Sequence, residues 1–271
     1  MSVVGRTDLE ERLRGQRNAG HKLLVPYVTG GLGPDWVRTV EAVAAAGADA
    51  IEVGLPFSDP VMDGPVIQEA SVRALAAGTT PRSILRDLQS ADTGVVPLAV
   101  MTYYNLIARS GLRRAANVIR DAGVSGVIVP DLPVDELDPW KKEAESAGLR
   151  TVLLAAPTTP DDRLALIAEK AGGFLYAVGV MGVTGERTAL AASAMTMASR
   201  CKDVTDLPVL VGVGISTPEQ AVEVCQVADG VVIGSALVRR LLDGGGPEAA
   251  GQLTEEFRQA LGVLRAPPVG A

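Results

Sequence analysis

The chain has 271 residues and a formal net charge of -7 at pH 7, from 25 Lys and Arg against 32 Asp and Glu. This acidic balance provides no electrostatic footprint for nucleic acid or anionic lipid. With 47% hydrophobic and 21% charged residues, the composition is that of a globular chain with a sizeable core. No apolar run reaches the roughly 18 residues of a membrane span, and the N-terminus has no signal-peptide core. We expect a soluble cytoplasmic protein that binds neither nucleic acid nor membrane.

Few residues are available for metal or nucleophilic chemistry. The chain has one histidine, His21, and two cysteines, Cys201 and Cys225, without Cys-x-x-Cys spacing. A zinc site or a Ser-His-Asp triad is therefore not expected, and neither is a disulfide framework. Any catalysis should use carboxylates, hydroxyls and backbone groups, with no metal.

The predicted elements begin with a helix through Leu9, Leu13 and Arg17, for which Thr7 or Asp8 can serve as N-cap. Eight short apolar runs follow. Because they lack polar alternation, they are typical of parallel strands covered on both faces. These runs are Leu23–Val28, Ala50–Val53, Val95–Met101, Gly126–Val129, Thr151–Ala155, Phe174–Val178, Val209–Val213 and Gly230–Ile233.

Segments of helical period lie between the strands, at Asp35–Ala46, Leu112–Ala122, Pro139–Ala147, Asp161–Ala171 and Pro218–Gln226. An Ala-Gly pair closes four of them, at 46–47, 122–123, 147–148 and 171–172, and the glycine is expected to form a left-handed cap. The spacing of these pairs indicates a unit of about 25 residues, with about three such units between the first and second pair.

Eight such units predict one closed (β/α)8 barrel over residues 1–271, with the N-terminal helix plugging its bottom. The alternative is an open doubly wound sheet. It is disfavoured because Thr29-Gly30-Gly31-Leu32-Gly33-Pro34 does not match the Gly-x-Gly-x-x-Gly expected after the first strand. Gly244 to Pro247 should separate the eighth helix from a last helix over Glu248–Leu264, and residues 267–271 read as a frayed tail.

Barrel enzymes act at the C-terminal ends of their strands, where two acids stand out. Glu52 interrupts the apolar strand Ala-Ile-Glu-Val-Gly, and a carboxylate there is either a structural acid or a general acid/base with a raised pKa. Asp131 follows the fourth strand and suits a supporting or Asx-turn role. The stiff loop from Gly54 to Pro65 adds Asp59 and Asp63, and spacing alone does not choose between a turn and a catalytic role for them.

Small residues after strands seven and eight suggest a phosphate site. Gly214, Gly234 and Ser235 stand where backbone N–H groups at helix N-termini bind phosphate in such barrels. The glycine-punctuated loop from Gly179 to Arg187 is either a plain connection or a lid over the substrate, and we favour the lid.

The stretch from Ile51 through Pro60, continued by Asp63-Gly64-Pro65 and Ile67-Gln68, resembles the signature of the tryptophan synthase alpha chain family. Further matches span nearly the whole chain, at Pro26–Thr29, Met101–Asn105, Pro130–Pro133, Gly182–Gly185, Gly214–Ser216 and Gly234-Ser235.

The resemblance implies a (β/α)8 lyase that splits indole-3-glycerol phosphate into indole and glyceraldehyde 3-phosphate by a retro-aldol reaction, without a cofactor of its own. By resemblance, Glu52 is the catalytic acid/base and Asp63 accepts a hydrogen bond from the indole N–H. Tyr176 borders the glycerol carbons and Thr184 is the lid residue that meets Asp63. Gly185, Gly214, Gly234 and Ser235 match the phosphate cradle.

The resemblance also implies a beta subunit as partner, in an alpha2beta2 heterotetramer. That subunit carries pyridoxal phosphate (PLP) and consumes the indole. Asp59 lies where the second loop of the family approaches this partner.

Three positions depart from the family pattern. Leu32 stands where many relatives have Asp, Val213 where many have an aromatic residue, and Val180-Met181 where relatives are more polar.

Two other functions compete with the lyase. One is a non-catalytic subunit that binds ligand and regulates its partner, which would not need a buried acid at position 52. The other is a different phosphate-ester barrel enzyme, which would usually carry Lys, Cys or Asp at the end of strand one, where this chain has Thr29.

Overall fold

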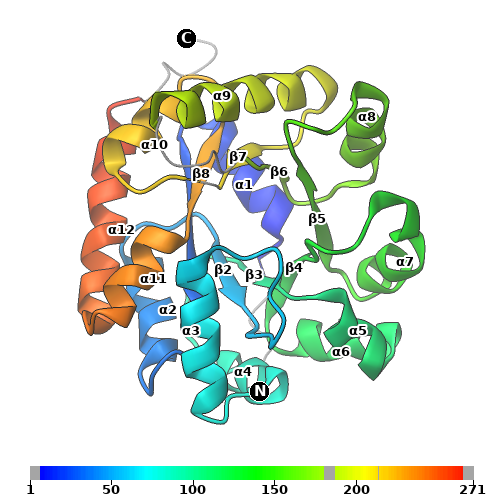
Figure 1. Ribbon diagram of the computed structural model, residues 1–271, viewed down its shortest axis with the longest axis vertical. Helices are drawn as coiled ribbons and strands as arrows, with labels where there is room; N and C mark the ends of the chain where they lie inside the picture. Colours follow the sequence, from blue (N-terminus) through cyan, green and yellow to red (C-terminus); the bar gives the residue numbers. More distant parts are fainter. Residues whose placement is uncertain (1–6, 180–186, 213, 265–271) are drawn as a thin grey trace.

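A computed structural model describes residues 7–179, 187–212 and 214–264. Within these ranges, parallel strands pair in sequence order and close into an eight-stranded barrel (Figure 1). The predicted (β/α)8 fold is confirmed. The strands are β1 Leu23–Thr29, β2 Ile51–Gly54, β3 Leu98–Met101, β4 Val124–Ile128, β5 Arg150–Ala155, β6 Leu175–Ala177, β7 Val209–Val211 and β8 Gly230–Ile233.

Helices surround the barrel, and the first and the last stand outside the β/α repeat, as predicted. They are α1 Leu9–Asn18, α2 Trp36–Ala45, α3 Pro65–Ala76, α4 Pro81–Leu88, α5 Tyr104–Ser110, α6 Leu112–Asp121, α7 Asp138–Ser146, α8 Asp161–Lys170, α9 Arg187–Val204, α10 Pro218–Val224, α11 Ser235–Leu242 and α12 Gly246–Gly262, with a 3-10 turn at Val134–Glu136. None of the helices in the described part of the chain is long and apolar enough to cross a membrane.

The number of units predicted from the repeat spacing was wrong in one interval. The residues between Ala46 and Ala122 hold two β/α units, each with two helices, instead of three units. Strand β3 also begins at Leu98, later than the predicted Val95, because a turn precedes it. In that turn Val96 N–H donates to Thr93 O (3.0 Å), and Val95 is 61% exposed.

The glycine caps follow the Ala-Gly pairs with one exception. Gly47, Gly123 and Gly148 have positive φ, as expected, but Gly172 does not, and Gly173 takes the left-handed conformation with φ +82°. The reason is that Ala171, after α8, is already extended, and Gly172 N–H donates to Thr151 O (2.8 Å). The left-handed glycine after α8 therefore lies one residue later than predicted.

Helix α1 closes the N-terminal end of the barrel, as the sequence predicts. Asp8 caps the helix by accepting from Glu11 N–H (2.9 Å). Leu9 and Leu13 are fully buried and pack with Phe174, just before β6, and with the inward-facing Leu210 of β7. Each buried leucine contributes about 2 kcal/mol through the apolar area it removes from water. In Figure 1 this helix (blue) lies across the ring of strands.

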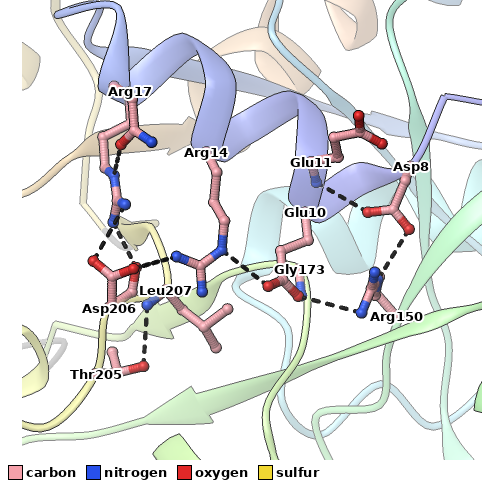
Figure 2. Close-up of polar contacts among 11 residues, drawn as sticks. Asp8, Glu10, Glu11, Arg14, Arg17, Arg150, Gly173, Thr205, Asp206 and Leu207 are labelled. Carbon is pink, nitrogen blue, oxygen red and sulfur yellow. Dashed lines mark hydrogen bonds and ion pairs between the residues drawn. The ribbon is translucent and has the colours of Figure 1, made fainter.

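Ion pairs fix α1 to two neighbouring βα units (Figure 2). Glu10 accepts from Arg14 Nε (2.9 Å) and from Gly173 N–H (3.0 Å). Asp206, which precedes β7, accepts hydrogen bonds from Arg14 Nη1 (2.5 Å) and Arg17 Nη2 (3.3 Å). The closed bottom leaves the opposite end of the barrel, at the strand C-termini, for a ligand.

The C-terminal helix starts two residues before its predicted position, at Gly246, with Pro247 in its first turn. The break predicted at Gly244 to Pro247 is confirmed, since α11 ends at Leu242. Helix α12 packs along α2 and α10 through Leu253, Phe257 and Leu261. The predicted tail at 267–271 lies outside the described residues.

Candidate active site

Glu52 lies in the middle of β2 and faces the interior of the barrel. Its strand neighbours Ile51 and Val53 belong to the outer core, whereas Ala50 packs inside, so the alternation of a strand turns Glu52 inward. In the sheet it is opposite Tyr27 of β1 and Ala99 of β3. The side chain is 1% exposed, and Oε2 has no hydrogen-bond partner in the described part of the chain.

Burial, and then the nearby charge of Asp63, together raise the pKa of Glu52 to about 8. The carboxyl group is therefore mostly protonated at neutral pH. A buried acid that keeps its proton without a fixed partner can donate that proton to a ligand in the barrel mouth.

Two other buried acids show what a structural carboxylate looks like in this fold. Asp49, just before β2, receives Arg258 Nη1 (2.9 Å) and Leu24 N–H (2.9 Å). Asp229, just before β8, receives Lys202 Nζ (2.5 Å) and Val209 N–H (2.9 Å). Both lie at the N-terminal ends of strands with charged partners, which offset part of the cost of burial, although burial still raises the pKa of Asp49. Glu52 has no such compensation, which favours the functional interpretation.

Asp63 lies near the end of the loop between β2 and α3, and Tyr103 holds it there. The Tyr103 hydroxyl donates to the Asp63 side chain and accepts from Met62 N–H (3.0 Å). The Tyr103 ring also stacks on Phe57, with 4.9 Å between ring centroids. One tyrosine thereby contacts both ends of this loop.

The pKa of Asp63 is raised to about 6 by burial, while the Tyr103 hydrogen bond acts in the opposite direction. Asp63 therefore ionises before Glu52 as the pH rises. At neutral pH the site pairs an ionised carboxylate with a protonated one, each available for a different role.

Two tyrosines complete the interior of the site. Tyr176, predicted to border the substrate, and Tyr27, which sequence reasoning missed as a site residue, face inward from β6 and β1. Glycines make room for both hydroxyls. A Cβ at Gly54 would lie 1.9 Å from Tyr27 Oη, and one at Gly212 would lie 2.1 Å from Tyr176 Oη. The available signal for Tyr27 was its alternation with Val25 along β1, which also faces inward.

Burial, and then the charge of Glu52, raise the pKa of Tyr176 well above its ordinary value. The hydroxyl thus stays protonated. It faces the same barrel interior as Glu52, because Tyr176 packs with the inward-facing strand residues.

The predicted phosphate residues lie at the ends of β7 and β8. Gly234 precedes α11 as its N-cap residue, and Ser235 is the first residue of that helix. A Cβ at Gly234 would lie 3.7 Å from Tyr27 Cβ, which places this helix start beside the interior tyrosine. Gly214 follows β7 with φ +83°.

The remaining predicted positions divide into two groups. Thr184, Gly185, Val213 and Val180-Met181 lie outside the described residues. Asp131 accepts from Tyr104 N–H (2.9 Å) and so supports the start of α5 beside Tyr103. Leu32, where many relatives have an acid, packs in the cluster that contains Tyr27 and Ile67.

The raised pKa of Glu52 predicts a pH-dependent stability difference. The folded chain holds this proton more tightly than the unfolded chain, so the stabilisation is complete below the ordinary pKa of 4.5 and is lost as the pH rises through about 8. Glu52→Gln cannot ionise. It is therefore expected to be more stable than the parent chain at pH 9, by up to about 5 kcal/mol, with little difference at pH 4.

Urea unfolding at the two pH values measures this difference. Glu11→Gln, at an exposed position of α1, is the matched control and should show the same small change at both. Equal stabilities of Glu52→Gln and the parent chain at pH 9 would mean that the carboxylate is compensated in the fold.

Comparison with known proteins agrees with this geometry. The family model of the tryptophan synthase alpha chain matches residues 13–262. The tryptophan synthase alpha chain of Thermobifida fusca is 43% identical over 262 residues, covering 94% of this chain and 96% of that protein. The one from Gloeobacter violaceus is 46% identical, with 90% of each covered. This chain belongs to the tryptophan synthase alpha chain family.

Solved structures of the family share the fold. Tryptophan synthase from Mycobacterium tuberculosis superposes with a TM-score of 0.86 at 36% identity, covering 96% of this chain and 99% of that one. The alpha subunit from Legionella pneumophila gives 0.85 at 32% identity, covering 94% and 98%. Tryptophan synthase alpha chains are lyases of tryptophan biosynthesis that cleave indole-3-glycerol phosphate and work with a beta subunit, which carries the PLP.

Proposed function

We propose that this tryptophan synthase alpha chain cleaves indole-3-glycerol phosphate with Glu52 as the acid/base and Asp63 as the partner of the indole N–H. The observation that carries the proposal is the buried Glu52 carboxyl group, which faces the barrel interior without a hydrogen-bond partner for Oε2 in the described structure. A structural acid at this depth would need a cation or backbone donors, as Asp49 and Asp229 have.

The chemistry requires that the indole ring leave as a neutral molecule. Glu52, protonated because its pKa is about 8, transfers its proton to C3 of the ring. The glycerol hydroxyl next to the breaking bond then gives its proton to the Glu52 carboxylate, which restores the acid, and its O–H electrons form the aldehyde C=O. The electrons of the broken C–C bond return to the ring, giving indole and glyceraldehyde 3-phosphate.

Protonation at C3 leaves positive charge on the ring, centred on its nitrogen. Asp63 is the acid that ionises first, so its carboxylate is available to accept the indole N–H and stabilise that charge. Tyr103 fixes the carboxylate before the substrate arrives. Tyr176 lies against the glycerol carbons, and Thr184 contacts the Asp63 side when the lid closes.

The phosphate is bound at Gly214, Gly234 and Ser235, with Gly185 from the lid. Support comes from the start of α11, where Gly234 leaves the first backbone N–H groups without a side-chain cap. These donors lie beside Tyr27, at the same end of the barrel as Glu52.

We also propose that the chain assembles with a beta subunit as an alpha2beta2 heterotetramer and passes indole to it. The loop between β2 and α3 supports this, since Val61 and Met62 are 81% and 55% exposed next to Asp63. Exposed apolar side chains beside a site are typical of a protein interface. In this proposal Asp59 of the same loop takes part in signalling between the two subunits.

The test is indole release from indole-3-glycerol phosphate by the purified chain, with and without a beta subunit. Indole is expected in both mixtures, and faster with the partner. Substrate binding without indole release in either mixture would instead indicate a regulatory subunit.

Gly234→Asp tests the phosphate site. A Cβ fits at this position, with its nearest contact 3.7 Å away, so the effect of the substitution comes from charge. A carboxylate against a phosphate dianion is expected to raise KM at least about tenfold with a smaller effect on kcat. Gly234→Asn, which has the same shape without the charge, is the control. Equal KM values for the two variants would place the phosphate elsewhere.

A further inference from the structure

A cavity of about 510 Å³ lies outside the barrel, between α4, α5 and α6. Its floor is apolar and includes Leu55, Leu85, Ile107 and Ile119. These four side chains are buried and belong to the core layer outside the strands. The cavity is therefore separated from the site around Glu52 by the wall of the barrel.

Three exposed arginines line this cavity, Arg82 of α4, Arg109 of α5 and Arg114 of α6, and no acid lines it. Arginines elsewhere in the described structure are mostly paired with a carboxylate. Apart from Arg12, the arginines without such a pair, among those whose side chains the structure describes, are these three. In a chain of net charge -7, unpaired cations concentrated around one cavity indicate an anionic occupant.

A buried polar group points to the same cavity. Thr102 is 1% exposed and lines the cavity floor, and its Oγ1 has no hydrogen-bond partner in the part of the chain that the structure describes. The preceding residue, Met101, packs inside the barrel, so the strand alternation directs Thr102 outward. A buried hydroxyl normally finds a partner, because leaving it unpaired costs about 1–3 kcal/mol.

We propose that this cavity is a binding site for a small organic carboxylate with a ring body. The apolar floor would cover the ring, and the volume is within the range of ligand pockets, about 300–1,000 Å³. Guanidinium groups bind carboxylates through paired N–H donors, so Arg109 and Arg114 hold the anion at the rim. Thr102 would hydrogen-bond only those ligands whose ring carries a polar substituent at the floor. The site is independent of the lyase reaction.

Calorimetric titration with 1-naphthoate and with its neutral analogue 1-naphthamide tests the site. One naphthoate is expected to bind per chain, about tenfold more tightly than the amide. The double variant Arg109→Gln, Arg114→Gln should weaken naphthoate binding about tenfold. Thr102→Val should leave it unchanged, because naphthoate has no polar group on the ring that reaches the floor. Arg113→Gln is the matched control. Arg113 is as exposed as its neighbour but pairs with Glu143 (3.0 Å), so this variant should bind like the parent chain.

Both arginine positions of the double variant are exposed, so the fold should be retained, and a melting curve within a few degrees of the parent confirms it. Three results would overturn the proposal: no naphthoate binding at millimolar concentration, equal binding of the amide, or unchanged affinity in the double variant. The last would mean that naphthoate occupies another site.

Discussion

Glu52→Gln is expected to lower kcat for indole release at least about a thousandfold while substrate affinity changes by less than about threefold. The amide keeps the size of the side chain and its position on β2, opposite Tyr27, but has no acidic proton to give to C3. Because the parent carboxyl is protonated at neutral pH, replacing it with a neutral amide leaves the charge of the ground-state site almost unchanged. The substitution therefore removes stabilisation of the transition state and leaves substrate binding almost unchanged.

Steady-state kinetics with a beta subunit present, together with equilibrium binding of the substrate, separate the two effects. The pH profile of the parent enzyme gives a further check, since activity should fall as the pH rises through about 8 and Glu52 loses its proton. Glu223→Gln, on α10 and away from the barrel interior, is the control and should retain the parent kcat. Normal turnover by Glu52→Gln would reject the proposed acid/base.

The barrel was predictable because its signals are local. Apolar runs of four to seven residues, half of them followed by a helical period closed by a glycine, specify strand, helix and turn within a short stretch of chain. Glu52 was predictable for the same reason, since a carboxylate in an otherwise apolar strand is visible in four letters of sequence. The starts of elements were less certain, as at Val95, where a Thr93 turn displaced the strand.

The support of the site depends on contacts that sequence spacing does not contain. Tyr103 lies within the Met101–Asn105 match to the family, but its bonds to Met62 and Asp63 join positions about 40 residues apart. Tyr27 reads as an ordinary β-strand aromatic until Gly54 on the neighbouring strand is seen to leave room for its hydroxyl. The buried ion pairs of Asp49 and Asp229 could not be predicted either, because their partners Arg258 and Lys202 come from other βα units.

Asp63→Asn is expected to lower kcat/KM about a hundredfold to a thousandfold. The amide can still accept a hydrogen bond from the indole N–H, but it has no negative charge to stabilise the protonated ring, and such transition-state electrostatics are worth about 3–4 kcal/mol. The substitution would also change the contact with Tyr103, whose hydroxyl now donates to a carboxylate.

The pH dependence distinguishes loss of charge from loss of shape. In the parent enzyme, activity should fall below about pH 6 as Asp63 takes up a proton, and above about pH 8 as Glu52 loses one. In Asp63→Asn the acidic limb should disappear while the alkaline limb remains, shifted to lower pH, because the neighbouring charge that raises the pKa of Glu52 is gone. Tyr103→Phe is the companion variant: it keeps the ring stacked on Phe57 but removes the hydrogen bond that lowers the pKa of Asp63, so its acidic limb should move to higher pH. An acidic limb that persists unchanged in Asp63→Asn would assign it to a group other than Asp63, and the pairing of one ionised and one protonated carboxyl group would have to be abandoned.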